Sequence, residues 1–331
     1  MAHKIETNDR QQGIIQAWHG KTEILPVITL ENNWLRDWEI VPLPLYLKGE
    51  KGEIETPFRI LTCSDSPDIS IGQSYNGETF RPVGNGEFLS LVENCISGTG
   101  HKITSVGSVR NRGRVFLSVE LQGMEKFRAA GRDFSAFLNF GNGHDKSSVL
   151  WVNTSNTCTV CDNTFSANLF SQENKKADLK VRVKHTKNVG MKFPDIAKLI
   201  DKAIGVQGEF LLALNEAEKI AVSEDTAREI FAGFIGGEVL SSRAENTVGR
   251  LVQLFKSGAG NSGRNMADVF SAATDYYSHE SSGGDNRAKQ FTSSEFGTAS
   301  QRKNDFFALL NSPEDLENVA AKGRNLLALA N

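Results

Sequence analysis

The residues with the clearest potential for chemistry lie between positions 144 and 185. Cys158 and Cys161 form a C-x-x-C pair, with His144 before it and His185 after it. Two thiolates at this spacing can bind zinc from one turn, and two histidines would complete a four-ligand set. The second tight pair typical of zinc ribbons is missing, and free cysteines are usually small buried side chains. The pattern favours buried thiols, so no metal or other cofactor is expected.

His144 and Asp145 are adjacent in a Gly-Asn-Gly-His-Asp segment. Such a pair can act as a general base or bind a metal. Neighbouring side chains diverge in an extended chain, however, and no nucleophile motif accompanies this pair. A turn stabilised by its own polar side chains is the simpler interpretation. A metal-dependent hydrolase using both residues with His185 or His279 is one alternative, but the leading expectation is a protein without enzymatic activity.

Basic side chains are concentrated in the middle of the chain. Residues 99–192 have a net charge of +8, whereas residues 1–98 carry −6 and residues 193–331 carry −5. Arginines on rigid strands can track phosphates, and nearby aromatic rings such as Trp151 can stack on bases. The residues expected to bind nucleic acid are Arg110, Arg112, Arg114, Lys126, Arg128, Arg132, Lys175, Lys176, Lys180, Arg182, Lys184, Lys187 and Trp151.

The elements that must position these residues predict an α+β fold. Alternating apolar residues over 36–185 indicate a mostly antiparallel, twisted sheet with one intervening helix over 87–96. Apolar residues at helical spacing follow from 193 onward, which predicts a C-terminal set of helices packed on the sheet. The expected organisation is an N-terminal arm (1–35), a basic β-rich core (36–192) and a helical region (193–331).

Several short motifs carry a resemblance to a known family. They are Ala17-Trp-His-Gly, Gln73-Ser-Tyr, Asn85-Gly-Glu, Gly113-Arg-Val-Phe, Asn142-Gly-His-Asp-Lys-Ser, Val160-Cys-Asp-Asn-Thr, His185-Thr-Lys-Asn, Ala272-Ala-Thr-Asp-Tyr-Tyr-Ser-His and Phe296-Gly. With these motifs the chain resembles the phage- and plasmid-like proteins that contain the domain of unknown function 932. It departs from them at Lys146, where a glycine is usual. The resemblance implies a phage, prophage or plasmid gene and no established reaction.

The leading hypothesis is a non-enzymatic protein that binds single-stranded DNA in phage replication or recombination. Strand annealing by a homo-oligomer is one form that this function could take. Host or phage replication proteins are further candidate partners. The alternative is a host-interaction or anti-defence protein that binds a bacterial protein through its acidic helical region. The chain has no apolar run of membrane-spanning length and begins with a polar segment, so we expect the cytoplasm of the infected host and no membrane partner.

Overall fold

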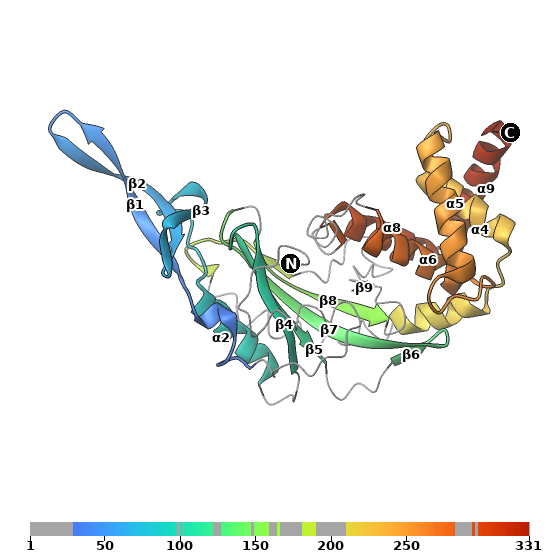
Figure 1. Cartoon of the computed structure of the whole chain (residues 1–331), viewed down its shortest axis with the longest axis horizontal. Helices are drawn as coiled ribbons and strands as arrows, with labels where there is room; N and C mark the ends of the chain where they lie inside the picture. Colours follow the sequence, from blue (N-terminus) through green and yellow to red (C-terminus); the bar gives the residue numbers. More distant parts are fainter. Residues whose placement is uncertain are drawn as a thin grey trace.

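A computed structural model describes residues 29–97, 100, 102–121, 127–146, 149–158, 164–165, 181–189, 210–281, 293–294 and 297–330 of the chain. At several strand positions within these ranges, only the backbone is described. Figure 1 shows an elongated molecule, with a β-ribbon at one end, a curved sheet in the middle and helices at the other end.

The first sheet has three antiparallel strands in the order β1-β2-β3: β1 (Ile40–Gly49), β2 (Gly52–Cys63) and β3 (Ser66–Asn76). The prolines at 42 and 44 predict an edge strand or an extended segment, and β1 is indeed an edge strand. A bulge is expected at Gly72. The register between β2 and β3 shifts at this level, and Gly72 has a φ of +67°. Both predictions are confirmed.

The second sheet follows the intervening helix, α2 (Asn85–Ile96), and is also antiparallel. Its main order is β10-β8-β7-β5-β4, with β6 paired to β7 and β9 to β8. The strands are β4 (Lys102–Val109), β5 (Arg114–Glu120), β6 (Phe127–Ala129), β7 (Arg132–Gly143), β8 (Leu150–Cys158), β9 (Thr164–Phe165) and β10 (Val181–Val183). The turn expected at Gly141 begins only at His144, because β7 continues to Gly143.

One core serves both sheets and α2. It contains Leu61 and Ile71 from the first sheet, Phe88 from the helix, and Leu117 and Phe140 from the second sheet. The α+β class with one intervening helix is therefore confirmed, but the strands form two sheets and not one. Among the described residues, no strand of the first sheet pairs with a strand of the second. The two sheets are held together by the apolar side chains of the shared core instead.

The helical region begins, among the described residues, with a helix over 210–219. It continues with α4 (Glu224–Ile235), α5 (Ser242–Ser257), α6 (Met266–His279), α8 (Thr298–Leu310) and α9 (Pro313–Ala330). The sequence Ser223-Glu-Asp predicts the start of a helix, since serine caps helices and acids favour the first turn. This prediction is confirmed, because the Ser223 hydroxyl accepts a hydrogen bond from the N–H of Thr226. The helix expected from Pro194 lies outside the described residues.

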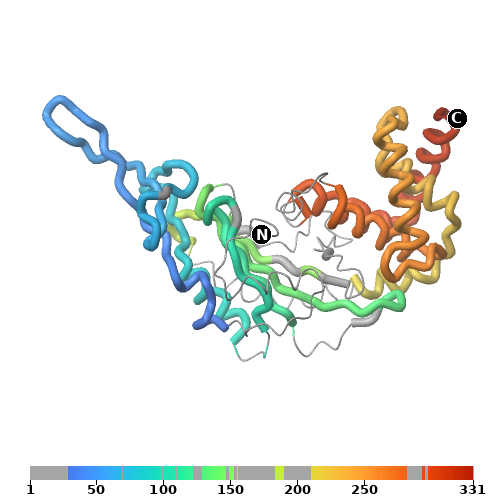
Figure 2. The backbone as a smooth tube through the Cα atoms, in the orientation of Figure 1, coloured from blue at the N-terminus to red at the C-terminus, as the bar shows by residue number. Residues whose placement is uncertain are grey.

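Strand β7 connects the two halves of the molecule (Figure 2). Its start lies in a second core, where the ring of Phe134 packs edge-on against Phe210 at 5.9 Å between centroids. Its far end contributes Phe140 to the first core. The helices thus contact the sheet at the start of β7. In the described part of the chain, no helix combines the length and apolar character needed to cross a membrane.

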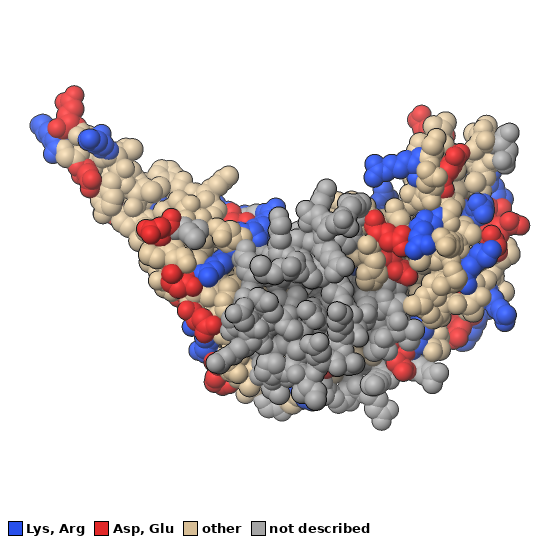
Figure 3. Space-filling model, in the orientation of Figure 1, with Lys and Arg blue, Asp and Glu red and all other residues tan. Residues whose placement is uncertain are grey.

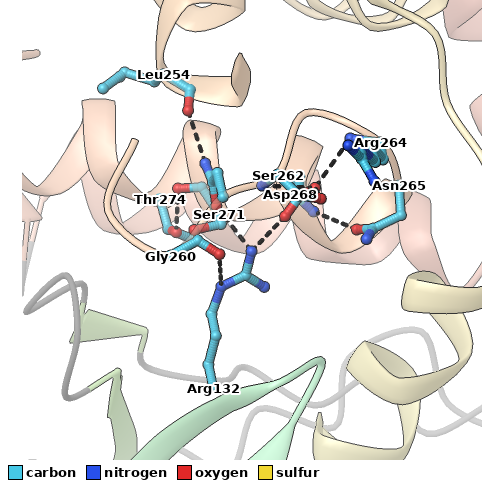
Figure 4. A network of polar contacts seen from close by, with 10 residues as sticks. Arg132, Leu254, Gly260, Ser262, Arg264, Asn265, Asp268, Ser271 and Thr274 are labelled. Atoms are coloured by element: carbon cyan, nitrogen blue, oxygen red, sulfur yellow. Dashed lines mark hydrogen bonds and ion pairs between the residues drawn. The ribbon is translucent and has the colours of Figure 1, made fainter. Parts of the chain in front are cut away.

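Arg132, at the start of β7, forms a buried network with the helices (Figure 4). Its guanidinium pairs with the carboxylate of Asp268 on α6, and it donates to the carbonyl of Gly260 (3.1 Å) and to Asn261 Oδ1 (2.9 Å). The other oxygen of Asp268 accepts from the Ser262 hydroxyl at 2.7 Å and from the N–H of Arg264 at 3.1 Å. This network fixes the orientation of the sheet relative to the helices.

Candidate nucleic-acid interface

The segment from Arg110 to Arg114, here called the arginine turn, contains the loop between β4 and β5 and the first residue of β5. Its backbone is unusual, because Arg110, Asn111 and Arg112 all have positive φ angles, of 62°, 53° and 61°. Non-glycine residues rarely adopt this left-handed region, and each one costs roughly 1 kcal/mol or more. Such a conformation persists only where its surroundings hold it in place.

Arg112 is one of the groups that hold the turn. Its guanidinium donates to Asp65 Oδ1 at 2.5 Å and lies over the rings of Trp38 and Trp34, at 4.8 and 5.5 Å from their centroids. Burial alone would lower the pKa of Arg112, but the hydrogen bonds and charges of Asp65 and Cys63 together outweigh it and raise the pKa. These contacts give the guanidinium of Arg112 a positioning role within the turn. Its side chain remains 22% exposed, and its contact with nucleic acid stays a prediction.

His144 is a second residue that supports the arginine turn. The main-chain N–H groups of His144 and Asp145 both donate to the carbonyl of Gly113, at 2.8 and 3.1 Å. The ring atom Nδ1 lies 3.2 Å from the carbonyl of Arg112, and Nε2 lies 3.1 Å from Asn142 Nδ2. A carbonyl only accepts and an amide nitrogen only donates, so these contacts assign the proton to Nδ1 of a neutral imidazole.

Asp145 fits beside the turn only because two neighbours are glycines. A Cβ atom on Gly72 would lie 2.6 Å from Asp145 Cα, and one on Gly113 would lie 2.9 Å from Asp145 Cβ. The Asp145 carboxylate reaches Arg110 Nη1 at 3.5 Å. His144 and Asp145 thus point to different partners, which supports a turn over a catalytic dyad.

His185 lies close to His144 beneath the turn. Its ring stacks on Phe80 with centroids 5.3 Å apart, and neither ring nitrogen has a hydrogen-bond partner among the described residues. The pKa of both histidines is lowered to about 4, mainly by burial, and the proximity of His144 contributes to the shift of His185. Asn142 completes the cluster by donating to the carbonyl of Val83 at 2.8 Å.

We expect this histidine cluster to make the protein sensitive to acid. The ordinary pKa of histidine is 6.5 and the folded value is about 4, so the unfolded chain binds more protons between these pH values. Stability is therefore full above pH 6.5 and falls as the pH drops towards 4. Each histidine contributes roughly 2–3 kcal/mol to this loss. Urea unfolding at pH 7 and pH 4.5 measures it.

The matched variant for this prediction is His185→Phe, which keeps the stack on Phe80 and removes one titrating group. Asp275 acts in the opposite direction in the same pH window, because burial, and then Glu280, raise its pKa to about 6. The informative quantity is therefore the difference between wild type and variant. We expect the loss between pH 7 and 4.5 to be smaller in the variant, and equal losses in both proteins would contradict the prediction.

Exposed cations surround the cluster and define what we call the basic rim. Its members are Arg110, Lys146, Lys184 and Lys187, with the partly buried Arg114 beside them. Burial, and then the charge of Arg110, lower the pKa of Arg114. The ammonium of Lys146 donates to the carbonyl of Ser74 at 2.5 Å. The rim thus combines side chains from three separate segments over one rigid support.

Two predicted nucleic-acid contacts are corrected by burial. Arg132 is 5% exposed and is paired with Asp268 in the network between sheet and helices. Trp151 is 6% exposed, and its indole covers Gly141 on the paired strand so closely that a Cβ atom there would lie 2.1 Å from the ring. Neither side chain can reach a polynucleotide in this fold.

The remaining predictions for this site stay open. Lys126, Lys175, Lys176, Lys180 and Cys161 lie outside the described residues, and for Arg128, Arg182 and Cys158 only the backbone is described. Among the residues that the structure describes, no group of three His, Cys, Asp or Glu side chains is placed to hold a metal ion.

Reasoning from the sequence missed the residues that support the turn. Trp34 falls in the expected N-terminal arm, and no local pattern links Trp34, Trp38 or Asp65 to the arginines. A pair of tryptophans four residues apart, with one arginine-rich loop elsewhere in the chain, was the available signal. No sequence signal identifies Asp65, because its partner Arg112 lies 47 residues away in the chain.

Together, the fold and the site define an α+β protein in which a strained, arginine-rich turn is held over a buried histidine cluster. Residues 74–305 match the family model described as Domain of unknown function (DUF932), and the chain therefore belongs to this family. Segments that suggested the resemblance, around Asn85, Gly113, Asn142 and His185, lie together at the site. Neither a curated protein nor a solved structure matches the chain.

Proposed function

We propose that this chain is a non-enzymatic protein that binds single-stranded nucleic acid, acting in phage DNA replication or recombination. The observation that carries the proposal is the arginine turn. Arg110 is exposed at a tip whose backbone is strained and whose neighbours are locked by Arg112 and His144. A rigid turn presents a cation at a defined position with little loss of entropy on binding.

The basic rim extends this surface. Lys184 and Lys187 follow β10, and Lys146 follows β7, so the cations come from strands of one sheet, with β8 between these two. Phosphate contacts of this kind support affinity without reading sequence. Because Trp151 is buried, bases cannot stack on its ring, and binding rests on phosphate contacts.

The test is a triple variant, Arg110→Ala/Lys184→Ala/Lys187→Ala, titrated by fluorescence anisotropy with single- and double-stranded oligonucleotides at two salt concentrations. Each phosphate contact on a single strand contributes about 0.7 to the slope of log K against log salt. We expect wild type to bind the single strand and the variant to lose about 2 from its slope, equally for all sequences.

The control removes three cations from the helical region, the exposed Lys219 and Arg243 and the partly buried Arg228, in Lys219→Ala/Arg228→Ala/Arg243→Ala. It changes the net charge by the same amount and should leave the slope unchanged. Equal losses in both variants would mean that binding follows net charge and not the rim. Absence of binding to any oligonucleotide, or tight binding that ignores salt, would refute the proposal and favour a protein partner from the host.

A further inference from the structure

Buried polar atoms without a partner are concentrated around the histidine cluster. Among the residues that the structure describes, five such side-chain atoms have no hydrogen-bond partner: Trp38 Nε1, Asn85 Oδ1, Asn142 Oδ1 and both ring nitrogens of His185. All four residues are 5% exposed or less. Leaving a buried polar atom unpaired is costly, and native proteins retain few of them. A group of five therefore indicates a bound species that the side chains are arranged to hold.

Contacts between these residues join them into one cluster. Asn85 Nδ2 donates to the carbonyl of Trp38 at 2.9 Å, and the Trp38 ring packs edge-on against His144 with centroids 6.0 Å apart. Asn142 Nδ2 lies 3.1 Å from Nε2 of His144. His185 lies close enough to His144 for the two rings to interact electrostatically. The unpaired atoms thus belong to one buried site, built from α2, the end of β7 and the segments beside β1 and β10.

The types of the unpaired atoms indicate what this site can bind. The amide oxygens of Asn85 and Asn142 only accept hydrogen bonds. Their nitrogens already donate to main-chain carbonyls, at 2.9 and 2.8 Å, which fixes the orientation of both amides. The carbonyl of Arg81 favours a proton on one ring nitrogen of His185, but no hydrogen bond forms, and the other nitrogen keeps its lone pair. Two amide oxygens and one imidazole nitrogen are ligands that a divalent metal ion accepts.

The charges next to the cluster favour a cation. Figure 3 shows acidic and basic side chains interspersed at the surface, where water and salt screen them. Glu39 is partly buried, and its charge and that of Asp145 act on His144 in the direction that favours positive charge. Among the described residues Glu39 forms no ion pair, and it accepts from main-chain N–H groups, including that of Asn85 at 2.7 Å. An anion would meet this carboxylate and two amide oxygens, whereas a cation would offset the charge.

Burial limits the size of the bound species. Side chains that are 5% exposed or less leave no opening for a nucleotide or a metabolite, but a single ion fits among them. One cation already packs against the cluster, Arg112 on the ring of Trp38, and Asp65 balances its charge. The indole N–H of Trp38, which no protein group accepts, can donate to a water molecule on the ion.

This set of ligands differs from the one that the sequence suggested. Cys158 and Cys161 with two histidines implied thiolate ligands, and that pattern favoured no metal. Both nitrogens of His144 are now engaged by a carbonyl and an amide, so His185 is the imidazole that remains. For this reason the described residues contain no group of three His, Cys, Asp or Glu side chains for a metal, and amide oxygens complete the set instead.

We propose that His185, Asn85 and Asn142 form a binding site for one divalent transition-metal ion, with Glu39 offsetting its charge. An imidazole ligand favours Zn²⁺ and Ni²⁺, whereas Mg²⁺ prefers oxygen ligands and retains its waters. The ion links α2, the end of β7 and the segment after β10, which together lie beneath the arginine turn. The inference goes beyond nucleic-acid binding and does not rest on it.

The test is isothermal titration calorimetry of the untagged full chain at pH 7, after removal of metals with EDTA, with Zn²⁺, Ni²⁺ and Mg²⁺ in turn. We expect one equivalent of Zn²⁺ or Ni²⁺ to bind and Mg²⁺ not to bind. His185→Phe keeps the stack on Phe80 and should weaken binding at least about tenfold. The matched control is His279→Phe, which removes an exposed histidine of α6 and should bind like wild type.

Two further measurements identify the ligands without relying on the folding of one variant. The absorption spectrum of wild type loaded with Co²⁺ should lack the intense thiolate charge-transfer band, because the ligands are nitrogen and oxygen. The variant Cys158→Ser/Cys161→Ser should bind Zn²⁺ like wild type. The proposal is overturned if wild type binds neither Zn²⁺ nor Ni²⁺, if a thiolate band appears, or if His185→Phe binds as tightly as wild type. These titrations contain no nucleic acid, so their outcome is separate from that of the anisotropy experiment.

Discussion

Asp268→Asn is expected to destabilise the protein by about 3–5 kcal/mol, because it leaves the buried guanidinium of Arg132 without its counter-charge. The carboxylate of Asp268 is 1% exposed and also accepts from Ser262 and the main chain of Arg264. An amide can replace only part of these contacts. Urea unfolding at pH 7 measures the loss, and we expect it to be the largest of the polar substitutions.

Glu317→Gln is the control that shows how much of this loss is due to burial of the ion pair. Glu317 binds Arg324 at 2.7 Å, a distance as short as many buried pairs, but the carboxylate is 70% exposed. Water screens such a pair, so we expect a change below about 1 kcal/mol. If the two variants lost similar free energy, the network between β7 and α6 would not be the link between the two halves.

The acid dependence of this pair has a defined sign. Burial alone would raise the pKa of Asp268, but hydrogen bonds from Ser262 and Arg264 and the charge of Arg132 lower it overall. The unfolded chain therefore takes up protons first as the pH falls. The pair stabilises the fold fully above about pH 4 and progressively less below it. This pH range lies below the one in which the histidine cluster loses its contribution.

Gly233→Ala is expected to cost at least about 2 kcal/mol, because α4 and α9 pack with their backbones in contact. A Cβ atom on Gly233 would lie 1.8 Å from the carbonyl oxygen of Val319, and one on Gly323 would lie 1.8 Å from that of Glu229. Backbone atoms cannot move aside as a flexible side chain can, so the two helices must separate. Thermal or urea unfolding of the variant measures the cost.

Gly249→Ala is the control for this prediction. Gly249 lies within α5, is exposed, and has nothing within 4 Å of an added Cβ atom. Alanine is a better helix former than glycine, so this variant should be more stable than wild type by about 0.5–1 kcal/mol. We therefore expect the glycine-to-alanine substitution to lower the stability of the protein in α4 and to raise it in α5. A stabilised Gly233→Ala protein would show that α4 and α9 do not pack in this way.

Local patterns were sufficient to predict most of the elements. Apolar residues three and four positions apart identified α2, and Ser223 marked the start of α4, because these signals act within one turn of helix. Alternation and a glycine-containing loop placed β4, β5 and the turn between them. The prolines of β1 marked an edge strand, since a residue without an N–H cannot pair on both sides.

What the sequence alone determined is therefore the α+β class, the order of the elements and the position of the arginine turn. Only the tertiary structure decided which cations are accessible: Arg110 is exposed, Arg112 is clamped by Trp34, Trp38 and Asp65, and Arg132 is buried against Asp268. The physical reason is the range of the interactions. Periodicity and capping depend on neighbours in the chain, whereas the burial and pairing of a charge depend on residues that lie 47 to 136 positions away.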